Sequence, residues 1–299
     1  AGSSQRRRMP ETASTAGGDS PQLSTVDFSP FLLNQGCVVG DEPTAAQLHT
    51  ASQINAACMT DGFLYLTDFG VTDADVDEAF VQAKRLFALS DDVKGGALKP
   101  YAPFTNTGFS KFASEAANSK RPPDLKEAFN IRSREVHAND YNGTPEGFDA
   151  TAERFWDTLQ TASRRIFLAI ALALRLPPAD SRFFEKAFVT WNQCTLRFLH
   201  YPPCDFEAGA SDGGDLSLAG GSLLSAIQPL ADGHGEADLD GGGGEEGEGG
   251  TAVNERSAAT KAQLRIGEHT DFGLITLLFH DSATSGEGLQ VKKAEGGAV

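Results

Sequence analysis

Apolar residues recur at helical spacing in the first half of the chain and predict two amphipathic helices there. The first helix covers residues 43–59 and ends before Asp61-Gly62. The second begins at Thr72, which forms a capping box with Asp75 three residues later. The predicted apolar faces consist of Leu48, Ala51, Ile54 and Ala57 or Cys58 in the first helix, and of Val76, Phe80, Ala83 and Phe87 in the second.

The longest apolar stripe covers residues 148–176 and predicts a third helix. Pro177-Pro178 ends it, because proline lacks an N–H group and its ring clashes with the preceding turn. Such a broad stripe is typical of a scaffold helix that packs against a sheet. A short helix around residues 180–187 follows.

Shorter stretches predict strands. Residues 195–201 alternate, so that Leu196, Phe198 and His200 face one way and the residues between them face the other. The other predicted strands are residues 26–32, 63–66 and 126–131, a short one over residues 264–268 and an apolar one over residues 274–279. Helices followed by strands indicate an α+β fold.

Three segments lack these patterns. Residues 95–123 are punctuated by Gly-Gly and Pro-Pro pairs, and we expect a loop. Residues 1–24 are polar, and residues 205–261 are acidic and contain 14 glycines. Neither can bury enough apolar surface to offset the entropy of ordering, so we expect both to be disordered. The second is interpreted as an insertion between two strands, with a transient helix at its apolar patch, residues 222–227; a retained intron would give the same composition.

Charge and hydropathy exclude two classes of partner. The net charge is −16, of which residues 205–261 contribute −10, with 12 acidic and two basic residues. A basic face for phosphate is lacking, so nucleic acid is not expected as a partner. The chain also has no run of eighteen apolar residues that would span a membrane.

The cysteines and the N-terminus bear on the cellular compartment. The four cysteines show no C-x-x-C spacing and indicate free thiols in a reducing compartment. The basic cluster at residues 6–8 is not followed by an apolar stretch, so it is no secretory signal, and we expect a cytoplasmic protein. An organelle transit peptide within residues 1–24 stays open, although Glu11 and Asp19 count against it.

His269 and Asp271 are the candidate metal ligands. Side chains two residues apart on extended backbone point to the same side, so this pair offers one nitrogen and one oxygen ligand. With a second histidine they would form the two-His, one-carboxylate face that suits non-haem Fe(II). The pair alone is more typical of an ordinary polar turn before a strand.

Several stretches in order resemble the Fe(II)/2-oxoglutarate-dependent dioxygenases of the isopenicillin N synthase-like family. They are Val26-Asp27-Phe28-Ser29-Pro30-Phe31-Leu32, residues 61–71, Asp124-Leu125-Lys126-Glu127-Ala128-Phe129, Leu196-Arg197-Phe198-Leu199-His200-Tyr201-Pro202-Pro203, the His269 segment, and Gly288-Leu289-Gln290-Val291. The resemblance covers residues 24–204 and 262–292. It implies a double-stranded β-helix (jelly-roll) core with an α-rich N-terminal part. The implied division is a disordered segment 1–24, a dioxygenase N-terminal region 25–140, and a dioxygenase domain 141–299 with the 205–261 insertion.

The resemblance also implies a chemistry. Fe(II) would bind His269 and Asp271, and 2-oxoglutarate would be decarboxylated while O2 oxidises a small organic substrate. Tyr201 matches the tyrosine that hydrogen-bonds the cosubstrate in relatives, whereas Leu199 replaces a frequent Asn. In relatives, residues matching 95–123 cover the mouth of the site, where Phe104, Asn106, Phe109 and Phe112 would line it or only fix the loop to the core.

Two parts of the family pattern are not found. In the family a second His ligand follows the Asp by about 50–60 residues and precedes an R-x-S motif whose Arg pairs with 2-oxoglutarate, but only 28 residues follow Asp271. We therefore expect a fragment or an incomplete gene model with a C-terminally incomplete jelly-roll. Among the other histidines, His280 is a weak ligand candidate and His200 is expected to pack. The alternatives are an inactive truncated product that acts as a binding module, and a zinc hydrolase.

Overall fold

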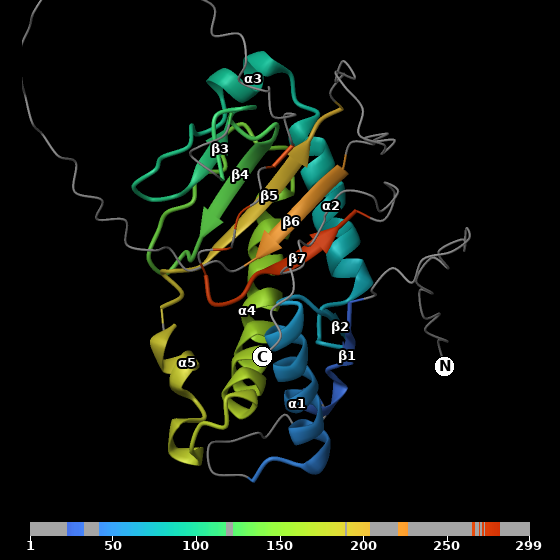
Figure 1. The fold of residues 1–299 in the computed structure, drawn as a ribbon. Coiled ribbons are helices and arrows are strands. Elements are labelled where there is room, and N and C mark those ends of the chain that lie inside the picture. The colour runs from blue at the N-terminus through green and yellow to red at the C-terminus, as the bar shows by residue number, and fades with distance from the viewer. Residues whose placement is uncertain are drawn as a thin grey trace, which may run out of the picture.

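The computed structural model describes residues 23–32, 42–117, 122–188, 190–203, 221–226, 265–266, 269, 271 and 273–281. These residues form helices and strands in the mixed arrangement that the sequence predicts (Figure 1). The predicted disordered segment 1–24 and most of the 205–261 insertion lie outside the described residues.

The N-terminal part consists of a small parallel strand pair beside one helix. Strand β1 (Thr25–Asp27) pairs with β2 (Tyr65–Thr67), and the short 3-10 helix η1 (Ser29–Phe31) follows β1. Helix α1 (Ala45–Thr60) begins with a capping box between Thr44 and Gln47.

The predicted apolar face of α1 is partly wrong. Leu48 and Cys58 are exposed, whereas Gln47 and Thr50 are buried. The reason is that these two polar side chains bind backbone carbonyls: Gln47 Nε2 donates to Pro30 O at 3.4 Å, and Thr50 Oγ1 donates to Asp27 O at 3.2 Å. Hydrogen bonding to β1 and η1 therefore decides which face of α1 is buried.

Helix α2 (Asp73–Phe87) confirms the predicted capping box. Asp75 N donates to Thr72 Oγ1 at 3.2 Å, and Thr72 N donates to Asp75 Oδ2 at 3.1 Å. Helix α3 (Asp91–Gly96) follows. The prediction of an uninterrupted loop over residues 95–123 is wrong, because Gly108–Ser110 form strand β3. This strand is too short for its alternation to be recognised, and its pairing partner β4 lies about 20 residues later in the chain.

The central sheet has five antiparallel strands in the order β3-β4-β5-β6-β7. Their bounds are β4 Glu127–Arg132, β5 Thr195–Tyr201, β6 Gly221–Ala226 and β7 Leu277–His280, with β3 as given above. The transient helix predicted over residues 222–227 is wrong, because β6 pairs with β5 on one side and β7 on the other. Backbone hydrogen bonds to strands that are distant in the sequence decide this conformation, and the local pattern of apolar residues cannot predict such bonds.

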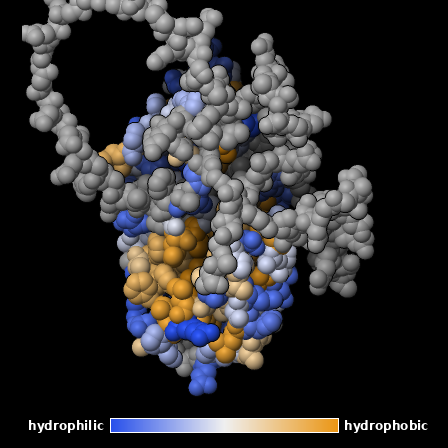
Figure 2. All heavy atoms as spheres, viewed as in Figure 1, coloured by the Kyte–Doolittle hydropathy of each residue, from blue (hydrophilic) through white to orange (hydrophobic). Residues whose placement is uncertain are grey.

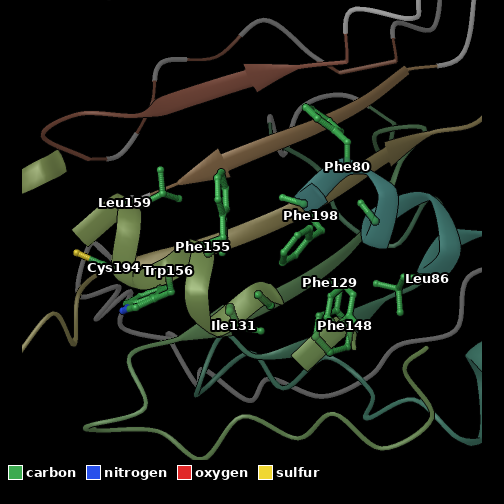
Figure 3. Packing of buried hydrophobic residues seen from close by; sticks show 14 of the residues in the cluster. Phe80, Leu86, Phe129, Ile131, Phe148, Phe155, Trp156, Leu159, Cys194 and Phe198 are labelled. Atoms are coloured by element: carbon green, nitrogen blue, oxygen red, sulfur yellow. The ribbon is translucent and has the colours of Figure 1, made fainter. Parts of the chain in front are cut away.

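One long helix supports the sheet. Helix α4 (Phe148–Ala173) runs behind the strands (Figure 1). Helix α2 contacts α4 and strands β5 and β6, and α1 lies beside the C-terminal half of α4. Side chains of α4 and the sheet point toward each other (Figure 3). This cluster includes Phe129, Ile131, Phe148, Phe155, Trp156, Leu159, Leu196 and Phe198. The scaffold role predicted for this helix is thus confirmed.

Two short helices, η2 (Pro178–Asp180) and α5 (Phe183–Ala187), follow α4. Apolar residues gather on the surface below the sheet, in the region of α1, α4 and α5 (Figure 2). Leu48, Leu174 and Phe183 are among the exposed apolar side chains in and beside these elements. None of the helices in the described ranges is long and apolar enough to cross a membrane.

Candidate functional site

His269 and Asp271 lie next to each other just before β7. His269 Nε2 is 3.5 Å from Asp271 Oδ1, and the two side chains are 29% and 41% exposed. The hydroxyl of Thr276 donates to Asp271 Oδ2 at 2.5 Å. Thr276 therefore holds the carboxylate by one oxygen and leaves the other oxygen facing the imidazole.

This pair fits one metal ion. Metal–nitrogen and metal–oxygen bonds to such ligands are about 2.0–2.2 Å long, and the separation of 3.5 Å lets one ion contact both atoms. Outer-shell hydrogen bonds of the kind that Thr276 makes orient ligating carboxylates in metal sites. Among the described residues, no group of three or more His, Cys, Asp or Glu side chains surrounds a common point. This part of the chain therefore offers two ligands.

The segment that carries His269 lies against the ends of β4 and β5. Arg265 O accepts from Leu125 N at 2.8 Å, and Arg265 Nη1 donates to Tyr201 O at 3.0 Å. Ile266 packs against a small cluster of Ala128, Leu199 and Tyr201. Arg265 and Ile266 are not in a strand, so the strand predicted over residues 264–268 is wrong for these two residues. Their contacts nevertheless place the segment on the face of the sheet that carries Tyr201.

Tyr201 ends β5 and is buried. Burial raises the pKa of its phenol, and the nearby carboxylate of Asp124 raises it further. The phenol is therefore neutral at physiological pH and can donate a hydrogen bond. Leu199, two residues earlier on the same face, offers only apolar surface.

A polar network occupies the same face of β4 and β5. Asn106 Oδ1 accepts from Tyr101 Oη at 3.0 Å and from Asn130 Nδ2 at 3.1 Å. Asn106 Nδ2 donates to Thr195 Oγ1 at 3.0 Å. Asn130 Oδ1 in turn accepts from Arg197 Nε at 3.1 Å. The network fixes the guanidinium of Arg197 above the sheet.

Of the four residues predicted at the mouth of the site, only Asn106 contacts this network. Phe104 is 99% exposed and Phe112 is also exposed. Phe109 is buried in the helix-side cluster, because β3 directs it to the opposite face from Ser110. Phe109 therefore fixes this segment to the core, which is the second of the two alternatives predicted for these residues.

Four charged residues lie at one end of the polar face, and they are not among the site residues predicted from the sequence. Arg197 Nη2 donates to Glu115 Oε2 at 2.5 Å, and Lys126 Nζ lies 2.9 Å from Asp124 Oδ2 and 3.8 Å from Glu115 Oε2. Burial alone would raise the pKa of Glu115, but Arg197, Ser110 and Lys126 outweigh it and lower the pKa. Lys126, directly before β4, and Arg197, in β5, are charged residues at buried or half-buried positions of alternating segments, and they were the available signal.

The chain is similar to known dioxygenases. The family profile described as "non-haem dioxygenase in morphine synthesis N-terminal" matches residues 23–150. "Proline hydroxylase buaE" of Petromyces alliaceus is 26% identical over 269 residues, which cover 87% of this chain and 65% of that protein. "2-oxoglutarate-dependent dioxygenase citB" of Monascus ruber is 24% identical over 294 residues, which cover 92% and 69%. The chain is a relative of the Fe(II)/2-oxoglutarate-dependent dioxygenases.

The chain spans about two thirds of the length of these curated dioxygenase relatives. Among solved structures, a 2OG-Fe(II) oxygenase family protein from Caulobacter crescentus is 25% identical with a TM-score of 0.46, and the match covers 62% of this chain and 58% of that one. The profile match contains β1 to β4 and ends in the first turn of α4.

Two other histidines lie in strands of the central sheet, His200 in β5 and His280 at the end of β7. His200 stacks on Phe87 with ring centroids 5.3 Å apart, and its Nδ1 lies 2.8 Å from Glu127 Oε1. The interpretation of His200 as a packing residue is confirmed. His280 ends β7 and is exposed, and through Leu223 it is in register with Leu199. As a ligand, His280 stays the weak candidate that the sequence indicates.

Proposed function

We propose that this chain forms the iron- and cosubstrate-binding part of a dioxygenase that oxidises a small organic molecule with O2 and decarboxylates 2-oxoglutarate. The observation that carries the proposal is the His269–Asp271 pair, whose facing atoms are 3.5 Å apart. Contacts of Arg265 and Ile266 hold the preceding segment against Tyr201. A family profile and relatives of the same class support it.

In this proposal His269 and Asp271 hold Fe(II), and Thr276 fixes the orientation of Asp271 through their hydrogen bond. Bound iron and 2-oxoglutarate together would supply the oxidising chemistry. The neutral phenol of Tyr201 would donate a hydrogen bond to a carboxylate of the cosubstrate. Leu199 cannot add a second polar contact there, so it would only restrict the position of the cosubstrate.

We also infer a jelly-roll core in which the five antiparallel strands form one wall. The polar face of β4 and β5, which carries Tyr201 and Arg197, would then point to the inside, and α4 would cover the outside. The register of the sheet and the packing of α4 support this arrangement. The domain division at residues 140 and 141 also stays a proposal; α4 begins shortly after it.

Metal binding tests the proposal directly. We expect the full chain to bind Co(II) or Mn(II), measured by absorption and by electron paramagnetic resonance. His269→Ala and Asp271→Ala should weaken this binding by more than about 10-fold, since even the loss of an outer-shell partner reaches that range. His49→Ala, which removes an exposed histidine on α1, is the matched control. Unchanged metal affinity in both site variants would refute the assignment.

Catalysis needs a separate measurement. We expect succinate and CO2 release that depends on added 2-oxoglutarate and Fe(II). Such release would exclude the zinc hydrolase. Metal binding without any release would favour the non-catalytic binding module.

A further inference from the structure

A cavity of about 380 Å3 lies against α4, on a different side of the helix from the residues that pack on the sheet. Its described lining consists of Gly70, Arg154, Asp157, Thr158, Thr161 and Arg165. The lining residues 154, 158, 161 and 165 recur at a spacing that places them on one face of α4. The volume lies in the range of small-molecule sites. None of the lining residues is buried, so a ligand can reach them.

The loop before α2 forms the opposite wall and adjoins the guanidinium of Arg165. Gly70 has a φ of +92°, and a Cβ atom there would lie 2.8 Å from Arg165 Nη1 and 3.1 Å from Leu32 Cδ2. Phe69 and Val71, on either side of Gly70, pack against buried apolar residues of the core. The loop is therefore anchored on both sides, and glycine leaves the space beside this guanidinium open.

The cavity has an excess of positive charge. The guanidinium of Arg165 has neither a hydrogen bond nor an ion pair within the described part of the chain. Arg154 has one long contact, from Nη2 to Thr151 Oγ1 at 3.5 Å. Asp157, which also lines the cavity, already binds Arg134, with 2.8 Å between Oδ1 and Nη2. Because a guanidinium presents a planar fork of N–H donors that fits carboxylate and phosphate, the cavity suits an anion.

The two threonines between the arginines add acceptors. Thr158 Oγ1 donates to Arg154 O at 3.1 Å, and Thr161 Oγ1 donates to Asp157 O at 2.9 Å. A hydroxyl has one proton and two lone pairs, so these two hydroxyls can only accept a hydrogen bond from a ligand. An O–H group of the ligand would supply the donor. The lining thus combines donors for an anion with acceptors for hydroxyl groups.

We propose that this cavity binds a small oxyanion that carries hydroxyl groups, namely the phosphate or the carboxylate of a short polyol. Arg165 binds the anionic group, and Thr161 accepts from a hydroxyl of the ligand. Their Cα atoms are one helical turn apart, about 6 Å, so one short molecule reaches both. The cavity is separate from the proposed iron site, since Tyr201 and Ile266 lie on the face of the sheet that points away from α4.

Calorimetric titration of the full chain, with a chelator and without 2-oxoglutarate, tests the ligand class. Glycerol 3-phosphate and glycerate carry an anion and hydroxyls, whereas propyl phosphate and propionate carry only the anion. We expect at least one hydroxylated anion to bind roughly fivefold or more tightly than its matched partner, the value of about one hydrogen bond. The tighter of the two identifies the anionic group. Equal binding within both pairs, or no binding of either hydroxylated anion, would overturn the proposal.

Arg165→Gln tests the anion contact. The variant should bind the preferred hydroxylated anion at least about tenfold more weakly, because it loses a hydrogen bond between charged groups. Arg165→Lys should recover only part of the affinity, since lysine keeps the charge without the fork. Arg175→Gln changes the net charge equally at an exposed position two residues after α4 and is the matched control. Equal losses in the Arg165→Gln and Arg175→Gln variants would reduce the effect to general charge and refute the site.

Thr161→Val tests the hydroxyl contact. It should abolish the preference for the hydroxylated anion and leave the affinity for its matched partner unchanged, since Arg165 stays in place. Thr60→Val is the matched control, because Thr60 is exposed and its hydroxyl also donates to the carbonyl four residues earlier, in α1. A preference that persists in Thr161→Val would refute the role of this hydroxyl. Should a variant fail to fold, the wild-type ranking of the four compounds still decides the proposal.

Discussion

The two faces of the β4–β5 strand pair differ in the chemistry of their side chains. The face toward α4 carries Phe129, Ile131, Leu196 and Phe198, all buried in one apolar cluster. The opposite face carries Asn130, Arg132, Arg197 and Tyr201, which are also largely buried. The first three make polar contacts, and Tyr201 has a hydroxyl group that can donate a hydrogen bond. Burial is thus shared by both faces, and only the chemistry of the side chains separates them.

The apolar and the polar face contribute to the protein in different ways. Apolar burial is non-directional and contributes about 25 cal/mol per Å2, so the helix side can stabilise the fold without exact partners. Buried polar groups contribute only when each has a partner. On the polar face, Asn130 and Arg197 have such partners among the described residues.

The largest expected effect is on the apolar face. Phe198→Ala should lower the free energy of unfolding by about 3–5 kcal/mol, because it leaves a cavity between β5 and Phe148. Phe198 and Phe148 have ring centroids 5.0 Å apart. Denaturant unfolding measures the change. Phe104→Ala is the control: its side chain is 99% exposed, and the effect should stay within about 0.5 kcal/mol. Similar losses of stability in both variants would contradict the inference that the buried apolar face stabilises the fold.

Glu127 is a charged residue on the otherwise apolar helix side of the strand pair. It binds Lys94 at 3.0 Å and His200 at 2.8 Å, at the end of the strand pair. Glu127→Gln should cost roughly 1–3 kcal/mol, since it leaves a buried cation with a weaker partner. Denaturant unfolding at neutral pH measures this loss. An unchanged stability would show that the charged end of this face contributes nothing.

The same residue predicts a pH dependence. Burial alone would raise the pKa of Glu127, but His200 and Lys94 outweigh it and lower the pKa below its ordinary value of 4.5. A lowered carboxyl pKa means that the stabilisation is complete above pH 4.5 and is lost as the pH falls through the lowered value. Glu127→Gln should therefore show a shallower loss of stability below pH 4.5 than the wild type. Parallel curves for the two proteins would contradict this assignment.

Local patterns in the sequence were sufficient for elements whose signals lie within a few residues. The capping box of Thr72 and Asp75 requires contacts only three residues apart, and the structure contains it. Strand β5 alternates over seven residues, and its predicted bounds match. The same alternation separates Phe198 from Arg197, so the two faces of this strand could be predicted.

Elements defined by distant partners could not be predicted in this way. Strand β6 exists because β5 and β7 pair with it, and its apolar residues alone also suit a helix. The burial of Gln47 on α1 depends on a carbonyl of η1. In the candidate site, the proximity of His269 and Asp271 followed from period two, whereas the contact of Glu115 with Arg197 joins residues 82 positions apart. No spacing rule connects those two residues.

The smallest expected effect concerns a single hydroxyl on the polar face. Tyr201→Phe keeps the packing against Ala128 and Ile266, so the unfolding free energy should change by less than about 0.5 kcal/mol. If Tyr201 contacts the cosubstrate, the affinity for 2-oxoglutarate should fall by roughly 5–10-fold, the value of one hydrogen bond. Calorimetry with 2-oxoglutarate and Mn(II) measures the affinity, and thermal unfolding measures stability. A large loss of stability with unchanged affinity would show that Tyr201 is a packing residue. The polar face would then also contribute to stability, and not only to binding.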